Sequence, residues 1–385
     1  MKLKIKFMLF IMLFSVTTVV SADEVDLAKN AKSAILIEAS TGEIMWEKNA
    51  HEKLAPASMT KMMSMLLVVE SIDKGNLKWD QMITVSENAS KMGGSQILLE
   101  TGEQMSVEDL FKGVAVASGN DAVVALGEAV GGSEEMFVKM MNDRAKELGL
   151  TETNFKNPHG LDEENHYSSA HDMAMIGKEL VKHKKVLEYT GIYEDYLRKG
   201  TPKEFWLVNT NKLVRFFKGV DGLKTGYTST AGYCLTATIE KDGMRLISVV
   251  MGEPEATTRN SETTGLINYG FSMYSLEKML TTSSDLGKAK VYQGENEYVT
   301  LQPLKDVNIL NNKNKDKRNV TYTLDIKTIK APVKKGEIVG KLNIIENGKT
   351  IDKIDITVKE NVKKANLIKM YLRNLKNILS GSIDF

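Results

Sequence analysis

Residues 55–69 read APASMTKMMSMLLVV, and this stretch combines a helix start with two chemically active side chains. Pro56 stands shortly before the apolar run, which predicts a buried helix over residues 58–73. Ser58 and Lys61 are three residues apart, so they share one face of that helix and the amine can reach the hydroxyl. A buried helix would therefore hold a nucleophile rigidly beside a base.

The Ser-x-x-Lys pattern alone is weak evidence for a nucleophile, because it also occurs by chance. Only the copy at Ser58 has both a preceding proline and a following apolar run. The alternative at this position is a serine that only caps the helix. The chance copies are Ser71 with Lys74 and Ser275 with Lys278.

A second short motif, Ser118-Gly119-Asn120, ends the stretch LFKGVAVASGN. Its Ser-x-Asn pattern recurs at residues 86–88, so it is also weak by itself. Beside a nucleophile, Ser118 could relay a proton to a leaving group.

A third motif, Lys224-Thr225-Gly226, is the only Lys-Thr-Gly in the chain. It comes just before a predicted strand over residues 233–239, so we expect it on an edge strand. Glycine in such a strand lets a ligand approach the backbone closely.

The two lysines of these motifs suit different tasks. A serine hydroxyl needs a base, and a lysine, whose pKa in water is about 10.4, serves only if desolvation and a neighbouring cation depress that pKa. Lys224 could be that cation for Lys61. Charged Lys224 and the Thr225 hydroxyl would then grip a substrate carboxylate.

The three motifs, in this order and spacing, resemble those of the penicillin-recognising serine enzymes. Beyond them, the chain after the first 22 residues resembles the low-molecular-mass D-alanyl-D-alanine carboxypeptidases of peptidase family S11. The resemblance includes NPHGLD at 157–162, YSSAHDMA at 167–174, a β-rich second domain and an amphipathic C-terminal segment. It implies a β-lactamase/transpeptidase-like catalytic fold of the α+β class.

The resemblance also implies roles for individual residues. Many members of the family have histidine at the position of Tyr227, so only its backbone N–H, not its side chain, is carried over. Arg259 is a weaker candidate for a second carboxylate-binding or structural group. The implied roles are Ser58 as acyl-ester nucleophile, Lys61 as general base, Ser118 in proton transfer, Asn120 on the substrate amide, Lys224 with Thr225 and Gly226 on the terminal carboxylate, and the N–H groups of Ser58 and Tyr227 as oxyanion hole.

Composition narrows the function classes. The chain has 385 residues, 51 basic against 50 acidic, which gives no electrostatic reason to bind nucleic acid. Cys234 is the single cysteine, which excludes an internal disulfide and favours a buried core position over a reactive thiol. Residues 1–22 have the three-part layout of a secretory signal peptide, with an uncleaved anchor as the alternative.

Hydrophobic patterning divides the rest of the chain. Strand patterns at 34–50 and 220–252 flank helical patterns at 58–73, 106–130 and 133–148, which predicts an α+β catalytic domain over 23–280, with an amphipathic stretch ending near 280. Short alternating strands, two of them around a type I′ turn signal at Asn347-Gly348, predict a small all-β domain over 285–358, either a ligand module or a spacer. Residues 361–380 predict a basic amphipathic helix for an anionic membrane surface, or one that packs on its own domain.

Several histidine and aspartate side chains in and after the NPHGLD segment could be taken for zinc ligands, but they match no known zinc-binding pattern. No His-Glu-x-x-His pair is present, and no Gly-x-Ser-x-Gly of an α/β-hydrolase. We therefore expect no metal and no cofactor. The residues in question are His159, His166, His171, Asp162 and Asp172.

The sequence thus predicts an exported, membrane-associated serine peptidase that removes the terminal D-alanine of peptidoglycan stem pentapeptides. β-Lactams should acylate the same serine. It would act at the outer face of a bacterial cytoplasmic membrane, in the cell wall compartment. The alternatives are a β-lactamase of the same fold and a catalytically idle penicillin sensor or wall-binding protein.

Overall fold

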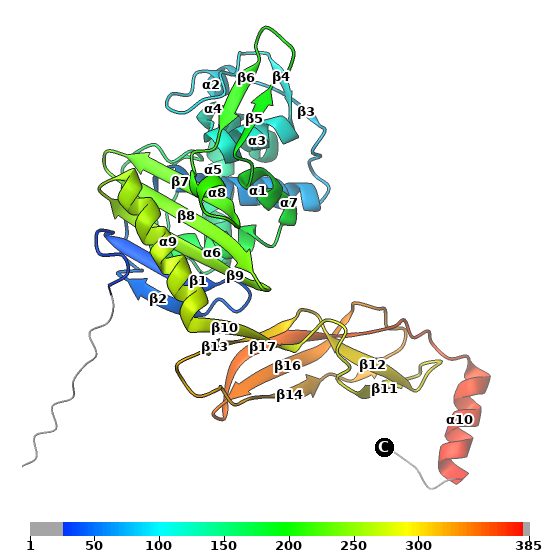
Figure 1. Cartoon of the computed structure of the whole chain (residues 1–385). Helices are drawn as coiled ribbons and strands as arrows, with labels where there is room; N and C mark the ends of the chain where they lie inside the picture. Colours follow the sequence, from blue (N-terminus) through cyan, green and yellow to red (C-terminus); the bar gives the residue numbers. More distant parts are fainter. Residues whose placement is uncertain (1–25, 380–385) are drawn as a thin grey trace, which may run out of the picture.

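The computed structural model describes residues 26–379, and the predicted signal peptide lies outside this range. Figure 1 shows an elongated molecule in which the mixed helical and sheet domain is followed by a β domain, with one helix at the far end of the β domain. The predicted α+β class with a smaller all-β domain is confirmed.

A five-stranded antiparallel sheet forms the centre of the first domain, in the order β2-β1-β9-β8-β7. Its strands come from both ends of the domain, as the sequence patterns predict. The buried run of β1 agrees with its place inside the sheet, between β2 and β9, because a strand that is covered on both faces is largely apolar. The strands are β1 (Ser33–Glu38), β2 (Ile44–Lys48), β7 (Val220–Thr228), β8 (Gly232–Lys241) and β9 (Met244–Glu253).

Helices cover both faces of this sheet (Figure 1). The long helix α9 packs on one face, over the smaller of two hydrophobic cores. Helix α6 packs on the other face, where the larger, main core lies. The helices α1, α3, α4 and α5, here called the helical lobe, contribute most of the remaining helical residues of this main core. Helix α1 is buried on nearly every side and lies inside the main core. The principal helices are α1 (Lys61–Asp73), α3 (Val107–Ala117), α4 (Asn120–Gly131), α5 (Glu134–Glu147), α6 (Ala170–Leu180) and α9 (Ala256–Met273).

Two predicted helical stretches differ from the structure. The stretch over 106–130 is broken, because Ser118 adopts the left-handed conformation (φ +64°) and caps α3 through a bond from its N–H to the Gly113 carbonyl. The stretch expected to reach residue 280 ends at Met273, and β10 (Tyr274–Leu280) follows and pairs with β13 (Val307–Asn312).

Short elements complete the first domain. The hairpin β5–β6 and the pair β3–β4 extend the helical lobe away from the sheet (Figure 1). These elements are η1 (Ala57–Thr60), β3 (Met82–Thr84), α2 (Glu87–Ser90), β4 (Gln104–Ser106), α7 (Lys184–Thr190), β5 (Glu194–Leu197), β6 (Phe205–Val208) and α8 (Leu213–Phe216).

The second domain has its own core between a six-stranded sheet, in the order β14-β16-β17-β12-β11-β15, and the β10–β13 pair. The predicted Asn347-Gly348 turn joins β16 and β17 with positive φ at both residues, as a type I′ turn requires. Arg318 of the second domain forms an ion pair with Glu43 of the first domain at 2.7 Å and another with Glu346 of its own domain at 2.7 Å. The pair with Glu43 connects the two domains. The remaining strands are β11 (Lys288–Tyr292), β12 (Tyr298–Pro303), β14 (Val320–Ile326), β15 (Ile329–Lys330), β16 (Ile338–Glu346) and β17 (Lys349–Val358).

Helix α10 (Leu367–Leu379) occupies the end of the described chain (Figure 1). Val362 and Ala365, which the sequence pattern assigns to its apolar stripe, lie instead in the core and border of the second domain. Between residues 26 and 379, no helix has the length and apolar character to cross a membrane.

Candidate active site

Ser58 lies in the 3-10 turn η1, immediately before α1. The preceding residue, Ala57, has φ +48°, a left-handed conformation that is uncommon for a residue with a side chain. We expected Ser58 inside the first α-helical turn, and the helix instead begins at Lys61. The spacing argument still holds, because a 3-10 turn also brings residues i and i+3 to one side.

The Ser58 hydroxyl is within hydrogen-bonding distance of the Lys61 amine. Lys61 Nζ lies 3.1 Å from Ser58 Oγ and 2.7 Å from the carbonyl oxygen of His159. Lys61 is completely buried, whereas Ser58 is half-buried. The structure therefore holds a partly accessible hydroxyl against an amine that solvent does not reach.

The surroundings of Lys61 favour its neutral form. Burial, reinforced by the positive charge of Lys224, holds the pKa of Lys61 well below its usual value, although the Asp121 carboxylate opposes this. Asp121 is itself buried and accepts hydrogen bonds from the backbone N–H groups of Ile97 and Leu99. A neutral lysine amine carries the lone pair that a general base needs.

The NPHGL segment, residues 157–161, packs against the 3-10 turn that carries Ser58. A Cβ built on Gly160 (φ +87°) would lie 1.9 Å from the Ala57 carbonyl oxygen, so only glycine fits there. The Gly160 N–H donates to Asn157 Oδ1 at 2.7 Å, and Ser64 Oγ on α1 donates to the Pro158 carbonyl at 2.7 Å. These positioning contacts were not identified from the sequence, although the resemblance includes their residues.

The break between α3 and α4 leaves two buried polar atoms unused. Ser118 Oγ and Asn120 Oδ1 make no hydrogen bond within residues 26–379. The Asn120 amide nitrogen is held, because Nδ2 donates to the Gly93 carbonyl at 2.7 Å. Buried polar atoms without partners are costly, and these two are free to bond a ligand.

The Lys-Thr-Gly motif lies on β7, at the edge of the sheet, as predicted. A Cβ on Gly226 would lie 2.8 Å from the Pro56 carbonyl and 3.1 Å from the Ser58 nitrogen. The absent side chain therefore allows β7 to approach the backbone of the nucleophile turn. The next residue, Tyr227, is 56% exposed, and its ring lies against that of Tyr233 at 4.3 Å.

Lys224 is buried on the same strand and donates to the Thr225 carbonyl at 3.0 Å. Burial, reinforced by the charge of Arg259, lowers the pKa of Lys224 to about 7. The Thr225 hydroxyl donates to Thr210 Oγ1 at 2.7 Å, a partner that the sequence did not reveal. Arg259 is buried at the start of α9, so the cationic environment extends behind Lys224.

The competing sequence patterns have ordinary structural explanations. Ser275 and Lys278 lie on the strand β10 and not on a helix, so they lose the geometry of the motif. Ser71 is buried in the last turn of α1. Cys234 is buried in β8, and burial raises the pKa of its thiol to about 11, which agrees with a core position.

The histidines that resembled a metal site do not form one group. Burial lowers the pKa of His159 to about 3 and that of His166 to about 4, which favours the neutral ring of each. His166 Nδ1 accepts from the Lys156 N–H, and its Nε2 lies 2.8 Å from Thr60 Oγ1. His171 belongs to a separate group at the start of α6.

Comparisons with known proteins agree with this arrangement. The family model described as D-alanyl-D-alanine carboxypeptidase, peptidase S11, matches residues 17–255. The model of the penicillin-binding protein 5 C-terminal domain matches residues 274–364. The D-alanyl-D-alanine carboxypeptidase DacF of Bacillus subtilis is 48% identical over 351 residues, which cover 91% of this chain and 90% of that protein.

Solved structures show the same relationship. Penicillin binding protein 5 from Haemophilus influenzae superposes with a TM-score of 0.70 at 35% identity, over 87% of this chain and 98% of that chain. Penicillin-Binding Protein D2 from Listeria monocytogenes, solved in an ampicillin-bound form, superposes with a TM-score of 0.57 at 33% identity, over 63% of this chain and 98% of that chain.

Proposed function

Because the chain belongs to the D-alanyl-D-alanine carboxypeptidases of peptidase family S11, we propose that it removes the terminal D-alanine of a peptidoglycan stem pentapeptide through an acyl ester on Ser58. The observation that carries the assignment of the nucleophile is the 3.1 Å contact between Ser58 Oγ and the buried Lys61 amine. No other serine in the Ser-x-x-Lys pattern has such a partner among the described residues.

Acylation follows from this contact. Neutral Lys61 takes the proton of the Ser58 hydroxyl while Oγ attacks the carbonyl carbon of the penultimate D-alanine. The backbone N–H groups of Ser58 and Tyr227 stabilise the oxyanion, which is supported by the close approach of β7 to the Ser58 nitrogen. The C–N bond then breaks, and the leaving D-alanine amine receives a proton through the Ser118 hydroxyl.

Substrate binding uses polar groups of the second and third motifs, and the bonds that Lys224 and Thr225 now make to the Thr225 carbonyl and to Thr210 are exchanged for bonds to the substrate. Lys224 and the Thr225 hydroxyl grip the terminal carboxylate, with Arg259 adding positive charge behind them. Asn120 Oδ1 accepts from an amide N–H of the peptide, which gives this buried oxygen its missing partner. Water then attacks the acyl ester, releases the shortened peptide and restores Ser58.

β-Lactams are proposed to acylate the same serine, because their strained amide presents a carbonyl and a carboxylate to the same groups. The ampicillin-bound Listeria relative supports this. The direct test incubates the purified protein with a pentapeptide that ends in D-Ala-D-Ala and measures free D-alanine, with and without penicillin. Ser58→Ala should abolish both release and labelling, and a label that maps to Ser71 or Ser275 would contradict the assignment.

We propose further that the protein is exported and attached to the membrane surface on its outer side. Residues 1–22 carry the signal pattern, and α10 supports the attachment. The apolar side chains of α10 are exposed and do not pack on the second domain, unlike Val362 and Ala365 before them. They are Leu367, Ile368, Tyr371, Leu372, Leu375, Ile378 and Leu379.

A further inference from the structure

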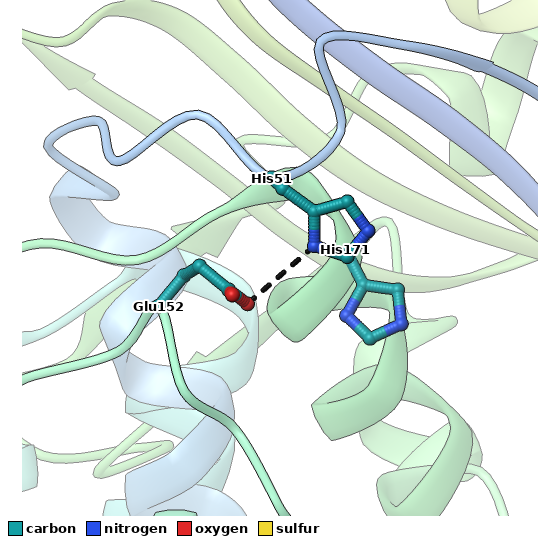
Figure 2. A group of neighbouring side chains, drawn as sticks. All are labelled: His51, Glu152 and His171. Atoms are coloured by element: carbon teal, nitrogen blue, oxygen red, sulfur yellow. Dashed lines mark ion pairs between the residues drawn. The ribbon is translucent and has the colours of Figure 1, made fainter.

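Three side chains with metal-binding atoms converge on the surface of the first domain, on segments far apart in the sequence. Figure 2 shows His51 from the loop after β2, Glu152 from the loop after α5 and His171 from the first turn of α6. One donor atom from each lies within 4.8 Å of the others. His51 Nδ1 is 3.5 Å from Glu152 Oε2, and the two imidazole rings are 4.6 Å apart.

A buried carboxylate behind the group orients the His171 side chain and holds the backbone at Glu152. Asp172 is completely buried, and its Oδ1 lies 3.1 Å from His171 Nδ1. Its Oδ2 accepts from the Glu152 N–H at 3.0 Å and from Thr153 Oγ1 at 2.7 Å. The Asp172 contact fixes the ring of His171 through Nδ1, so Nε2 is the ring nitrogen that this carboxylate does not bind. Metal-ligating histidines in proteins are oriented by carboxylates in this way.

We propose that His51, Glu152 and His171 bind one divalent cation of the zinc class, with water completing a tetrahedral site. Two imidazoles and one carboxylate are donors that zinc accepts, whereas calcium and magnesium prefer oxygen ligands alone. Ligands at about 2.0–2.1 Å from zinc are roughly 3.4 Å apart, so the group must contract. The exposed His51 side chain is free to rotate and supplies this movement.

The ion would connect the segment that carries the nucleophile to the body of the domain. The His171 N–H donates to the Ala50 carbonyl at 2.9 Å, and Leu54 pairs with Ser168 four residues further on. This segment continues directly to Ser58. Backbone hydrogen bonds already connect residues 50–54 to residues 168–171, and an ion bound by His51 and His171 would add a second connection between them. Because the ion binds only the folded protein, it should raise the melting temperature. The proposed reaction uses no step at this site.

The test titrates untagged protein with ZnCl₂ by calorimetry, since a histidine tag would bind zinc itself. We expect one Zn²⁺ per chain. His51→Ala should weaken binding at least tenfold without unfolding the protein, because the side chain is exposed. His183→Ala is the matched control: this histidine also pairs with a carboxylate, Asp73, and should leave binding unchanged. Equal zinc affinity in the His51→Ala and unchanged proteins would overturn the proposal.

A second measurement identifies the ligands without relying on affinity. Co²⁺ in a tetrahedral site gives strong visible absorption, so Co²⁺ added to the untagged protein should produce this band, and Glu152→Gln and His51→Ala should each reduce it. Zn²⁺ should also raise the melting temperature of the unchanged protein but not that of His51→Ala. A Co²⁺ spectrum typical of six-coordinate hydrated cobalt, or the same rise in melting temperature in both proteins, would contradict the site.

Discussion

The carbonyl oxygen of His159 accepts a hydrogen bond from Lys61 Nζ at 2.7 Å, while Ser58 Oγ lies 3.1 Å from the same nitrogen. A neutral amine has two N–H groups and one lone pair. When one N–H is bound by the carbonyl, the amine can rotate only in ways that keep this bond, and one of them directs the lone pair at the serine hydroxyl. The NPHGL segment therefore positions both the proposed base, Lys61, and the 3-10 turn that carries Ser58.

The first prediction concerns Gly160, whose missing side chain leaves room for the Ala57 carbonyl. Gly160→Ala should displace the nucleophile turn or the His159 carbonyl by about 1 Å, and a shift of this size costs about 10²-fold in rate. The measurement is the rate of covalent labelling by penicillin in protein that circular dichroism shows to be folded.

Gly102→Ala is the matched control for this substitution. Gly102 also has a positive φ, +81°, but a Cβ there would meet nothing within 4 Å. Both variants therefore carry the same kind of backbone strain, and only Gly160→Ala adds the steric clash. Similar labelling rates in the two variants would show that the clash is relieved without moving Ser58.

The second prediction separates the two lysines. Lys61→Ala should reduce acylation about 10²- to 10⁴-fold with every acyl donor, because it removes the base from the chemical step. Lys224→Ala should reduce kcat/KM about 10- to 100-fold, and mainly for donors with a free terminal carboxylate, because burial alone still lowers the pKa of Lys61. Comparison of acid and C-terminal amide substrates measures this. If Lys224→Ala still discriminated fully against the amide, the carboxylate would bind elsewhere, with Arg259 the next residue to test.

The third prediction is a falling alkaline limb in kcat/KM. Lys61 must be neutral to act, and its depressed pKa makes it so at neutral pH. Lys224 must be charged to bind the carboxylate, and its pKa of about 7 means that this charge is lost as the pH rises through that value. Activity on an acid substrate should therefore fall above about pH 7, whereas activity on the amide should not. The same alkaline limb for both substrates would exclude Lys224 as its cause.

Much of the fold could be predicted because its signals are local. The apolar run after Lys61 and the Asn347-Gly348 turn each determine the structure within a few residues, and both predictions are confirmed. The break at Ser118 was missed, although Ser118-Gly119-Asn120-Asp121 interrupts the apolar pattern and is typical of a turn. The left-handed turn there depends on tertiary contacts, including the packing of Gly119 against Ile97.

The site shows the same division between local and distant contacts. Ser58 and Lys61 are three residues apart, so their contact follows from helical geometry alone. The His159 carbonyl is 98 residues from Lys61 and acts through its backbone, so no residue type identifies it. The proposed metal-binding group is hidden in the sequence for a related reason, because His51 and His171 form no short spaced motif and only the fold brings them together.

The fourth prediction concerns α10 and the residue at which a deletion can begin without destabilising the second domain. A deletion that began at residue 361 would remove Val362 and Ala365, which are buried in the second domain. Deletion of residues 367–385 should instead leave the melting temperature and the hydrolysis of a soluble peptide nearly unchanged. It should also abolish sedimentation with anionic vesicles at low salt, because it removes the exposed apolar face of α10 together with Lys369 and Lys376.

A single substitution tests whether the exposed apolar face makes this attachment. Leu372 is 57% exposed on α10, so Leu372→Asp should weaken vesicle binding without disturbing the core. Leu304→Asp is the control, since Leu304 is also exposed, at 46%, but lies in the second domain before β13. Arg373 should add little, because its charge is already paired with Glu297 at 2.7 Å. Vesicle binding that is unchanged by the deletion and by Leu372→Asp would exclude α10 as the anchor, and binding lost equally in both Asp variants would indicate an effect of charge alone.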